Sequence, residues 1–245
     1  EQSTKFFTFL DVNRPLGLER YTKSLIEGLS AHYPDYALIV VDAEACAQNG
    51  CRIDKDKKLI DNLRIAFAFE VPVLIVVTKI DCLEKSAGDR EGGGEDVLDD
   101  ILFELRNQVW DLGKRVGNVI RNKRDIVVVN RQMELVCPIF AVSNRTLEGI
   151  ALFKDFLNSL QFKPDDENEE QPLFVDSEFR VTKIFQHKYD NVTLGGIVHK
   201  GRFRRQQRIW IGPNSEGAFS VVEIKTIQCN SIPVRQVKAG QICAL

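Results

Sequence analysis

Three short apolar segments in the first part of the chain each end on a polar residue. They cover residues 5–10, 36–41 and 71–77, and they are followed by Asp11, Asp42 and Thr78. A continuous apolar run of this length is typical of a strand that is buried on both faces of a sheet. Segments with apolar residues at helical spacing lie between these runs. The sequence therefore predicts a mostly parallel sheet covered on both sides by helices. Such sheets bind ligands at the carboxyl ends of their strands, so we expect a site at these polar residues.

The remaining pattern of this region supports the same fold class. Apolar residues repeat at helical spacing in residues 18–29, 59–67, 96–116 and 147–160, which predicts four helices. Two further strands are predicted for residues 125–130 and 138–142 because they are rich in β-branched or aromatic residues. The second of these strands is followed by Ser143.

A polar segment between two prolines divides the chain. Residues 163–172 contain no apolar side chain, as expected for an exposed acidic linker. Residues 1–162 form the predicted α/β domain, and residues 173–245 consist of short β-type runs separated by Gly and Pro, which predicts a small antiparallel barrel. Residues 173–245 carry 11 Lys and Arg against 5 Asp and Glu, so we expect this basic domain to face an anionic partner.

Composition excludes several classes of protein. The six cysteines form no CxxC pair and the three histidines are far apart in the sequence, so a zinc site or a disulfide scaffold is not expected. No apolar run approaches the ~18 residues of a membrane span, and we expect a cytoplasmic protein without membrane contact. The first residue is Glu1, from which we expect a processed chain or a fragment.

The tetrad Thr78-Lys79-Ile80-Asp81 follows a predicted buried strand directly. A carboxylate at Asp81 could accept hydrogen bonds from both N1–H and the exocyclic amine of guanine, which adenine cannot offer. Lys79 would lay its aliphatic stem along the base, and the hydroxyl of Thr78 would join neighbouring loops. The loop with Ser143 and Asn144 could direct a backbone N–H at the guanine O6. The alternative interpretation is a surface turn in which the aspartate caps a helix.

Motifs along nearly the whole chain occur in the order of a known family. They are Phe9-Leu10-Asp11 before Leu18-Glu19-Arg20-Tyr21, residues 33–42, 71–81 and 137–144, and, in the second domain, residues 191–198 and 208–213. The chain resembles the elongation-factor-like translational GTPases of the group that contains GTP-binding protein 1 and GTP-binding protein 2, relatives of elongation factor Tu. The resemblance implies a P-loop GTPase domain followed by a translation-protein β-barrel, with GTP or GDP and Mg²⁺ at the strand ends.

The resemblance also assigns residues at the phosphate end of the site. Asp11 would hold Mg²⁺ through water, and the N–H of Gly17 would sense the γ-phosphate. Leu18 stands where the family has a water-positioning histidine, and a leucine cannot polarise water, so intrinsic hydrolysis is in question and no catalytic residue is assigned.

The phosphate-binding motif of the family does not occur in this sequence. No G-x-x-x-x-G-K-[ST] is present in the 245 residues, although the family has one before the strand that residues 6–10 resemble. Either the chain begins after the P-loop and first switch, so that the G domain is partial, or the protein lacks them. The barrel, with residues 173–245 alone, is also expected to be short of strands.

A basic run in the second domain offers a contact surface. Arg202, Arg204, Arg205 and Arg208 flank one aromatic residue and could neutralise phosphates of an RNA or of a ribosomal or tRNA partner. The alternative is a solvated hairpin.

Three functions remain open at this level. The first is a GTP-binding, translation-factor-like GTPase in which GTP switches the interaction with an RNA-bearing partner. The second is a pseudo-GTPase interaction module that neither binds nor hydrolyses nucleotide. The third is an RNA-binding protein that ignores nucleotides.

Overall fold

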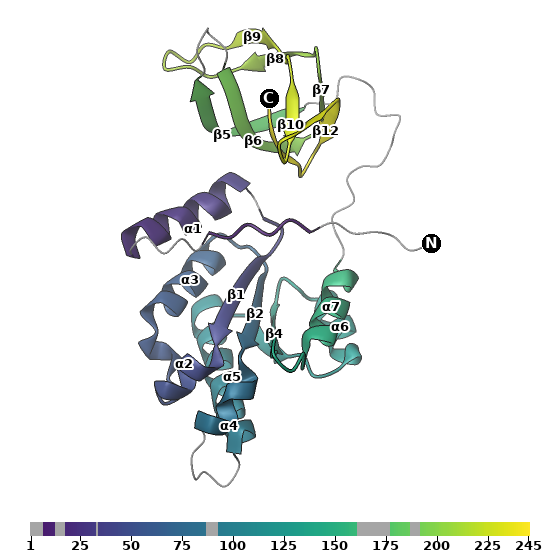
Figure 1. The fold of residues 1–245 in the computed structure, drawn as a ribbon. Helices are drawn as coiled ribbons and strands as arrows, with labels where there is room; N and C mark the ends of the chain where they lie inside the picture. The colour runs from purple at the N-terminus through teal and green to yellow at the C-terminus, as the bar shows by residue number, and fades with distance from the viewer. Residues whose placement is uncertain (1–6, 13–17, 33, 87–92, 161–176, 187–191) are drawn as a thin grey trace. The chain divides into compact units, whose positions relative to one another are not determined.

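A computed structural model describes residues 7–12, 18–32, 34–86, 93–160, 177–186 and 192–245 (Figure 1). The chain divides into two compact units, Glu1–Phe162 and Lys163–Leu245. The predicted linker at residues 163–172 and Gly17 lie outside the described residues.

The first unit is built on a parallel sheet in the order β1-β2-β4-β3 (Figure 1). The strands are β1 (Ala37–Asp42), β2 (Val73–Thr78), β3 (Val116–Val119) and β4 (Val136–Ala141). All three pairings are parallel, and the register of β1 and β2 sets Asp42 beside Thr78. The carboxyl ends of these two strands therefore lie next to each other, as the apolar runs predict.

Helices cover both faces of this sheet. They are α1 (Leu18–His32), α2 (Ala43–Gln48), α3 (Lys57–Ala68), α4 (Leu83–Ser86), α5 (Gly93–Gly113), α6 (Lys123–Asn130) and α7 (Ile150–Ser159), with 3-10 turns η1 (Ile53–Lys55) and η2 (Ile80–Cys82). Successive residues of β2 alternate between two apolar cores, so Ile75 packs with α3 and α5 and Val76 packs with α6 and α7. Because both faces of β2 are buried, its residues Val73 to Val77 are all apolar.

The second unit consists of short antiparallel strands. They are β5 (Glu178–Gln186), β6 (Val192–Lys200), β7 (Arg202–Arg204), β8 (Arg208–Ile211), β9 (Ser220–Glu223), β10 (Ile227–Cys229), β11 (Ile232–Val234), β12 (Gln236–Lys238) and β13 (Ile242–Ala244). Five form the sheet β11-β10-β13-β6-β5, and two ribbons pair β12 with β7 and β8 with β9. Val198, Phe203, Ile227 and Val237 are among the side chains of its buried core.

The strand predicted for residues 125–130 is wrong, because these residues lie in helix α6. Asn122 caps the helix by accepting hydrogen bonds from the N–H groups of Arg124 and Asp125, and the Asp125 carboxylate in turn accepts a hydrogen bond from the Asn122 N–H. This capping box satisfies N–H groups that would otherwise lack partners in the first turn. Ile126 and Val129 share the buried helix face. Capping and burial outweigh the preference of β-branched residues for strands.

Two other predictions need correction. Residues 7–10 are not in a strand, and Phe9 and Leu10 are 69% and 40% exposed. Apolar composition alone does not make a strand, since a strand must also bury a face. The helix predicted to reach residue 116 ends at Gly113, where Lys114 adopts a left-handed conformation (φ 52°), and Val116 begins β3 instead.

Candidate functional site

The tetrad Thr78-Lys79-Ile80-Asp81 turns sharply at the end of β2. Lys79 has a left-handed backbone (φ 62°) and directly precedes η2, which contains Asp81. The Thr78 hydroxyl donates a 3.1 Å hydrogen bond to the carbonyl oxygen of Val41 on β1. This hydrogen bond therefore fixes the turn to the neighbouring strand end. A left-handed backbone is unfavourable for a residue other than glycine, so the surrounding contacts must hold Lys79 in this conformation.

Asp81 lies against the loop that follows β4. The hydroxyl of Ser143 donates a 2.5 Å hydrogen bond to Oδ1 of Asp81, and the Cys82 thiol lies 3.8 Å from Oδ2. Ser143 is fully buried, and its oxygen accepts the N–H groups of Arg145 (3.2 Å) and Thr146 (3.1 Å). Because both N–H groups point at this oxygen, its own proton is directed at Asp81. One buried serine thus fixes the position of the carboxylate.

The charge state of Asp81 follows from this geometry. The hydrogen bond from Ser143 is the main cause that lowers the pKa of the Asp81 carboxyl, and desolvation opposes it. The positive charge of Arg145 and the hydrogen bonds of the Asp81 N–H and the Cys82 thiol lower the pKa further. The group is an ionised acceptor with lone pairs left for a ligand.

Lys79 pairs with the residue that ends β1. Its Nζ lies 2.6 Å from Oδ2 of Asp42, while Oδ1 of Asp42 accepts the N–H groups of Glu44 (3.0 Å) and Ala45 (3.2 Å) and caps α2. Burial raises the pKa of Asp42, but the hydrogen bonds from Lys79, Ala45 and Glu44 and the charge of Lys79 outweigh it and lower the pKa. The same hydrogen bond raises the pKa of Lys79. The side chain of Lys79 remains 53% exposed in this pairing.

The structure thus brings together Thr78, Lys79, Asp81 and Ser143 from two strand ends. Asn144 is exposed in the turn after Ser143. Asp42 was expected at a strand end, but its pairing with Lys79 carries no local sequence signal, because 37 residues separate the two. A planar base with two adjacent N–H donors would match the Asp81 carboxylate, and the exposed stem of Lys79 would cover a ring face.

The phosphate end of the predicted site is less defined. Asp11 is exposed and follows a segment that is not a strand. Gly17 and the side chain of Leu18 lie outside the described part of the chain. Among the described residues, no group of three or more His, Cys, Asp or Glu side chains could hold a metal ion. No described helix is long and apolar enough to cross a membrane.

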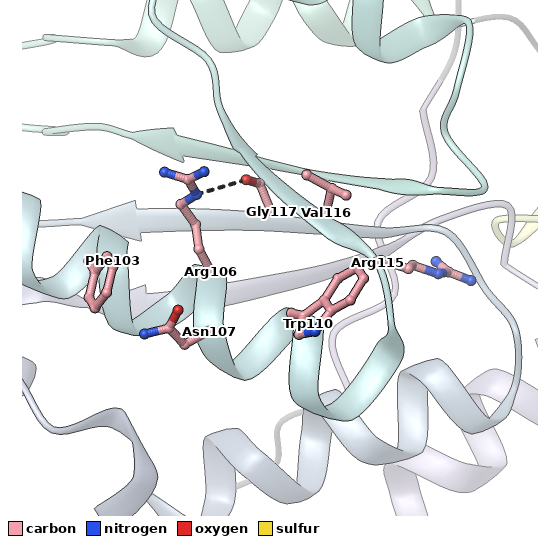
Figure 2. Close-up of a pocket in the computed structure, with 7 residues that line it drawn as sticks. All are labelled: Phe103, Arg106, Asn107, Trp110, Arg115, Val116 and Gly117. Carbon is pink, nitrogen blue, oxygen red and sulfur yellow. Dashed lines mark hydrogen bonds between the residues drawn. The ribbon is translucent and has the colours of Figure 1, made fainter.

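A separate hollow of about 260 Å³ lies between α5 and β3 and contains none of the predicted site residues (Figure 2). Phe103 and Trp110 line it from one face of α5 and are 61% and 53% exposed. Arg106, from the same helix face, donates a 3.1 Å hydrogen bond from Nε to the carbonyl oxygen of Gly117 on β3 (Figure 2). No strand was predicted at residues 116–119, so this hollow was not anticipated from the sequence pattern.

Known proteins support the predicted resemblance. GTP-binding protein 1 of Xenopus laevis is 29% identical over 244 residues, which is 98% of this chain and 33% of that protein. GTP-binding protein 2 of Homo sapiens is 28% identical over 249 residues, which is 100% of this chain and 38% of that protein. The chain therefore spans about a third of the length of the curated relatives it matches. No family model matches the chain.

Solved structures support the fold. The translation elongation factor SelB from Methanococcus maripaludis, in complex with the GTP analogue GppNHp, has a TM-score of 0.56 at 17% identity over 93% of this chain and 40% of its own. The bacterial selenocysteine-specific elongation factor EF-Sec has a TM-score of 0.55 at 21% identity over 94% of this chain and 31% of its own. The predicted class, a G-domain-like parallel α/β sheet followed by an antiparallel β unit, is confirmed.

Proposed function

We propose that this chain is the guanine-nucleotide-binding part of a translation-factor-like GTPase, in which Asp81 selects the base. The observation that carries the proposal is the 2.5 Å hydrogen bond by which the buried Ser143 holds the Asp81 carboxylate. The names of the relatives, GTP-binding proteins 1 and 2, and the GTP analogue in the SelB structure support guanine nucleotide as the ligand.

Each residue of the strand-end cluster has a role in this proposal. Asp81 accepts N1–H and the exocyclic amine of guanine, and Lys79 covers one face of the ring with its stem. Thr78 ties the turn to β1 through Val41. Ser143 and Asn144 form the loop that offers a backbone N–H to O6. Exclusion of adenine follows, because adenine would leave the ionised carboxylate without its donors.

The phosphate end of the site is proposed from the resemblance. Asp11 would hold Mg²⁺ through water, and Gly17 would contact the γ-phosphate. Among the described residues, no group of three or more His, Cys, Asp or Glu side chains could hold a metal ion, so the proposal of Mg²⁺ rests on the resemblance. With Leu18 at the histidine position, we expect hydrolysis to depend on groups supplied by a partner.

A second candidate is a pseudo-GTPase interaction module that does not bind nucleotide. The observation in its favour is that G-x-x-x-x-G-K-[ST] does not occur in the 245 residues. Without that cradle the β- and γ-phosphates lose their backbone N–H donors and the lysine charge.

The partner that we propose bears RNA, as in a ribosome or a tRNA complex, and GTP would switch this interaction. Arg202, Arg204, Arg205 and Arg208 of the second unit are the proposed contacts, since guanidinium groups bind phosphate in a bidentate manner. This function implies the cytoplasm as the compartment.

Fluorescent GDP and GTP titrated against the 245-residue chain, with ATP and xanthosine nucleotides as competitors, test the proposal. Asp81→Ala should weaken guanine binding about 10- to 100-fold, because hydrogen bonds to a charged acceptor contribute about 1.5–3 kcal/mol. Asp81→Asn should shift the preference from guanine to xanthine, since an amide cannot accept both guanine donors. Asp61→Asn is the matched control, because Asp61 is exposed on α3 and its ion-pair partner among the described residues is Arg64 on its own helix.

The outcomes separate the two candidates. Binding that resists ATP and is lost in Asp81→Ala supports the proposal. No binding of any guanine nucleotide favours the interaction module. An unchanged guanine-over-xanthine preference in Asp81→Asn would remove Asp81 from base selection even if nucleotide binds.

A further inference from the structure

Two cations face each other across a short ribbon of the second unit. Strands β7 and β12 pair antiparallel, with Arg202 opposite Lys238 and Arg204 opposite Gln236. Phe203 and Val237, the residues between, are 3% and 1% exposed and belong to the core. Because side chains alternate along a strand, the four polar side chains share the outward face of the ribbon.

The pairing of Arg202 with Lys238 is unfavourable in the isolated chain. Directly opposed residues of an antiparallel pair have their Cβ atoms about 4.5–5.5 Å apart, and like charges at that distance destabilise the pair. Within the part of the chain that the structure describes, neither side chain makes an ion pair with a carboxylate.

Two further arginines extend this charge. The N–H of Arg205 donates a 3.1 Å hydrogen bond to the carbonyl oxygen of Arg235, so the two residues are neighbours at the end of the ribbon. Nε of Arg205 is held by the carbonyl oxygen of Lys225 at 3.0 Å. Arg202, Arg204 and Lys238 on the outward face, together with the exposed Arg205 and Arg235 at the end of the ribbon, form what we name the cationic ribbon. Arg235 and Lys238 are far from the basic run in the sequence and join it only through the fold.

Arg208, which belongs to the same basic run, has a different environment. It lies on β8, and the register of β8 and β9 sets Glu223 directly opposite it. A carboxylate at that position offsets the arginine charge, as cross-strand pairs of opposite sign do. The uncompensated charge of the run is therefore concentrated at the cationic ribbon.

We infer that the cationic ribbon binds the sugar-phosphate backbone of RNA, with Arg235 and Lys238 as contacts alongside Arg202, Arg204 and Arg205. The outward face of the ribbon carries only polar and charged side chains, whereas the centre of a protein interface needs buried aromatic or aliphatic anchors. Guanidinium forks match phosphate oxygens, and closely spaced cations gain most when a polyanion releases its counterions. The choice of RNA among polyanions rests on the proposed function.

The test measures binding of a fluorescein-labelled RNA hairpin to the 245-residue chain over a range of salt concentrations. Neutralising both new contacts, in Arg235→Gln/Lys238→Gln, should reduce the slope of log K against log salt by about 2, because each phosphate contact contributes about 1. The control Lys123→Gln/Arg180→Gln removes the same net charge from two cations that already pair, with Asp155 at 2.8 Å and with Glu178 at 2.8 Å, and should leave the slope unchanged. The thermal midpoint of each variant confirms folding.

Loss of slope in Arg235→Gln/Lys238→Gln, with a melting temperature equal to or above that of the parent, supports the inference, because Lys238→Gln removes the repulsion with Arg202 and the variant is folded. An unchanged slope in this variant overturns it. Poly-glutamate or phosphatidylserine vesicles that bind while the hairpin does not would also overturn it. Nucleotide binding is measured on the same variants, so a failure of the Asp81 site is distinguishable from a failure of the ribbon.

Discussion

The hydroxyl of Ser143 donates a 2.5 Å hydrogen bond to the carboxylate of Asp81, although 62 positions separate the two residues in the chain. The bond joins the turn after β2 to the turn after β4. It favours the ionised form of the Asp81 carboxylate, which is the proposed acceptor for the base. Most of the following predictions concern the groups that keep this edge of the sheet in place.

Ser143→Ala should destabilise the first unit by about 1–3 kcal/mol. The substitution removes the donor to Asp81 and leaves the N–H groups of Arg145 and Thr146 without their acceptor, and the loss of hydrogen-bond partners at a part-buried position carries this cost. Urea denaturation followed by Trp110 fluorescence in a Trp210→Phe background reports on this unit alone. Ser30→Ala is the control, because its hydroxyl is exposed on α1, and a change beyond about 0.5 kcal/mol there would discredit the comparison.

The same substitution should raise the pKa of the Asp81 carboxyl toward its ordinary value, because the hydrogen bond from Ser143 is the main cause that lowers it. Since the folded pKa lies below the unfolded one, the stability that Asp81 contributes is present above the unfolded pKa and is lost as the pH falls through the folded pKa. An NMR titration of the Asp81 carboxyl carbon in the parent and in Ser143→Ala measures this shift directly. Identical titration curves would show that the hydrogen bond does not control the charge.

Asp42→Asn and Asp42→Ala should differ by about 1 kcal/mol. Asparagine keeps the cap of α2 and loses only the exposed pair with Lys79, which contributes less than about 1 kcal/mol. Alanine loses the cap as well. Asp56 offers a matched comparison, because it caps α3 through the N–H groups of Lys58 and Leu59. Asp56→Asn should then be close to neutral and Asp56→Ala should cost about 1 kcal/mol, as read from urea midpoints.

Gly149→Ala should destabilise the first unit more than Gly50→Ala. Both glycines have φ near 70°, so each substitution carries a left-handed penalty of about 1–2 kcal/mol. A Cβ at Gly149 would also collide with the backbone carbonyl of Ala141, whereas nothing lies within 4 Å of a Cβ at Gly50. We expect a total of about 3 kcal/mol or more for Gly149→Ala. Equal urea midpoints would show that the turn after Ser143 can move away.

The buried thiols should resist alkylation in the folded chain. Burial raises the pKa of Cys137 to about 12 and is the main cause that raises the pKa of Cys46 and of Cys243 to about 11 each. Thiolate is the reactive form, so iodoacetamide at pH 8 should modify the half-buried Cys82 and Cys229 first, as mass spectrometry would detect. Rapid labelling of Cys137 before unfolding would contradict its burial, and guanidinium-unfolded chain provides full labelling as the reference.

Local sequence patterns correctly predicted those helices and strands whose conformation depends mainly on their own residues. The apolar run of β2 and the polar residue after it predicted a buried strand with a site at its end, and the structure places Thr78 and Asp81 there. The prediction failed for residues 125–130, where β-branched residues form α6, because the Asn122 capping box and a buried face decide the helix. It failed for β3 because a single left-handed residue, Lys114, ends α5.

The sequence by itself determined the alternation of strands and helices and the residue types at the strand ends, because these depend on spacing within a few turns or strands. It also determined the acidic composition of residues 163–172, before the basic β unit. Only the tertiary structure decided which of these residues meet. Strand register and the packing of the turns set Ser143 on Asp81, Lys79 on Asp42 and Lys238 opposite Arg202. Those pairs join positions far apart in the chain, and their contact depends on how whole elements pack rather than on any local pattern.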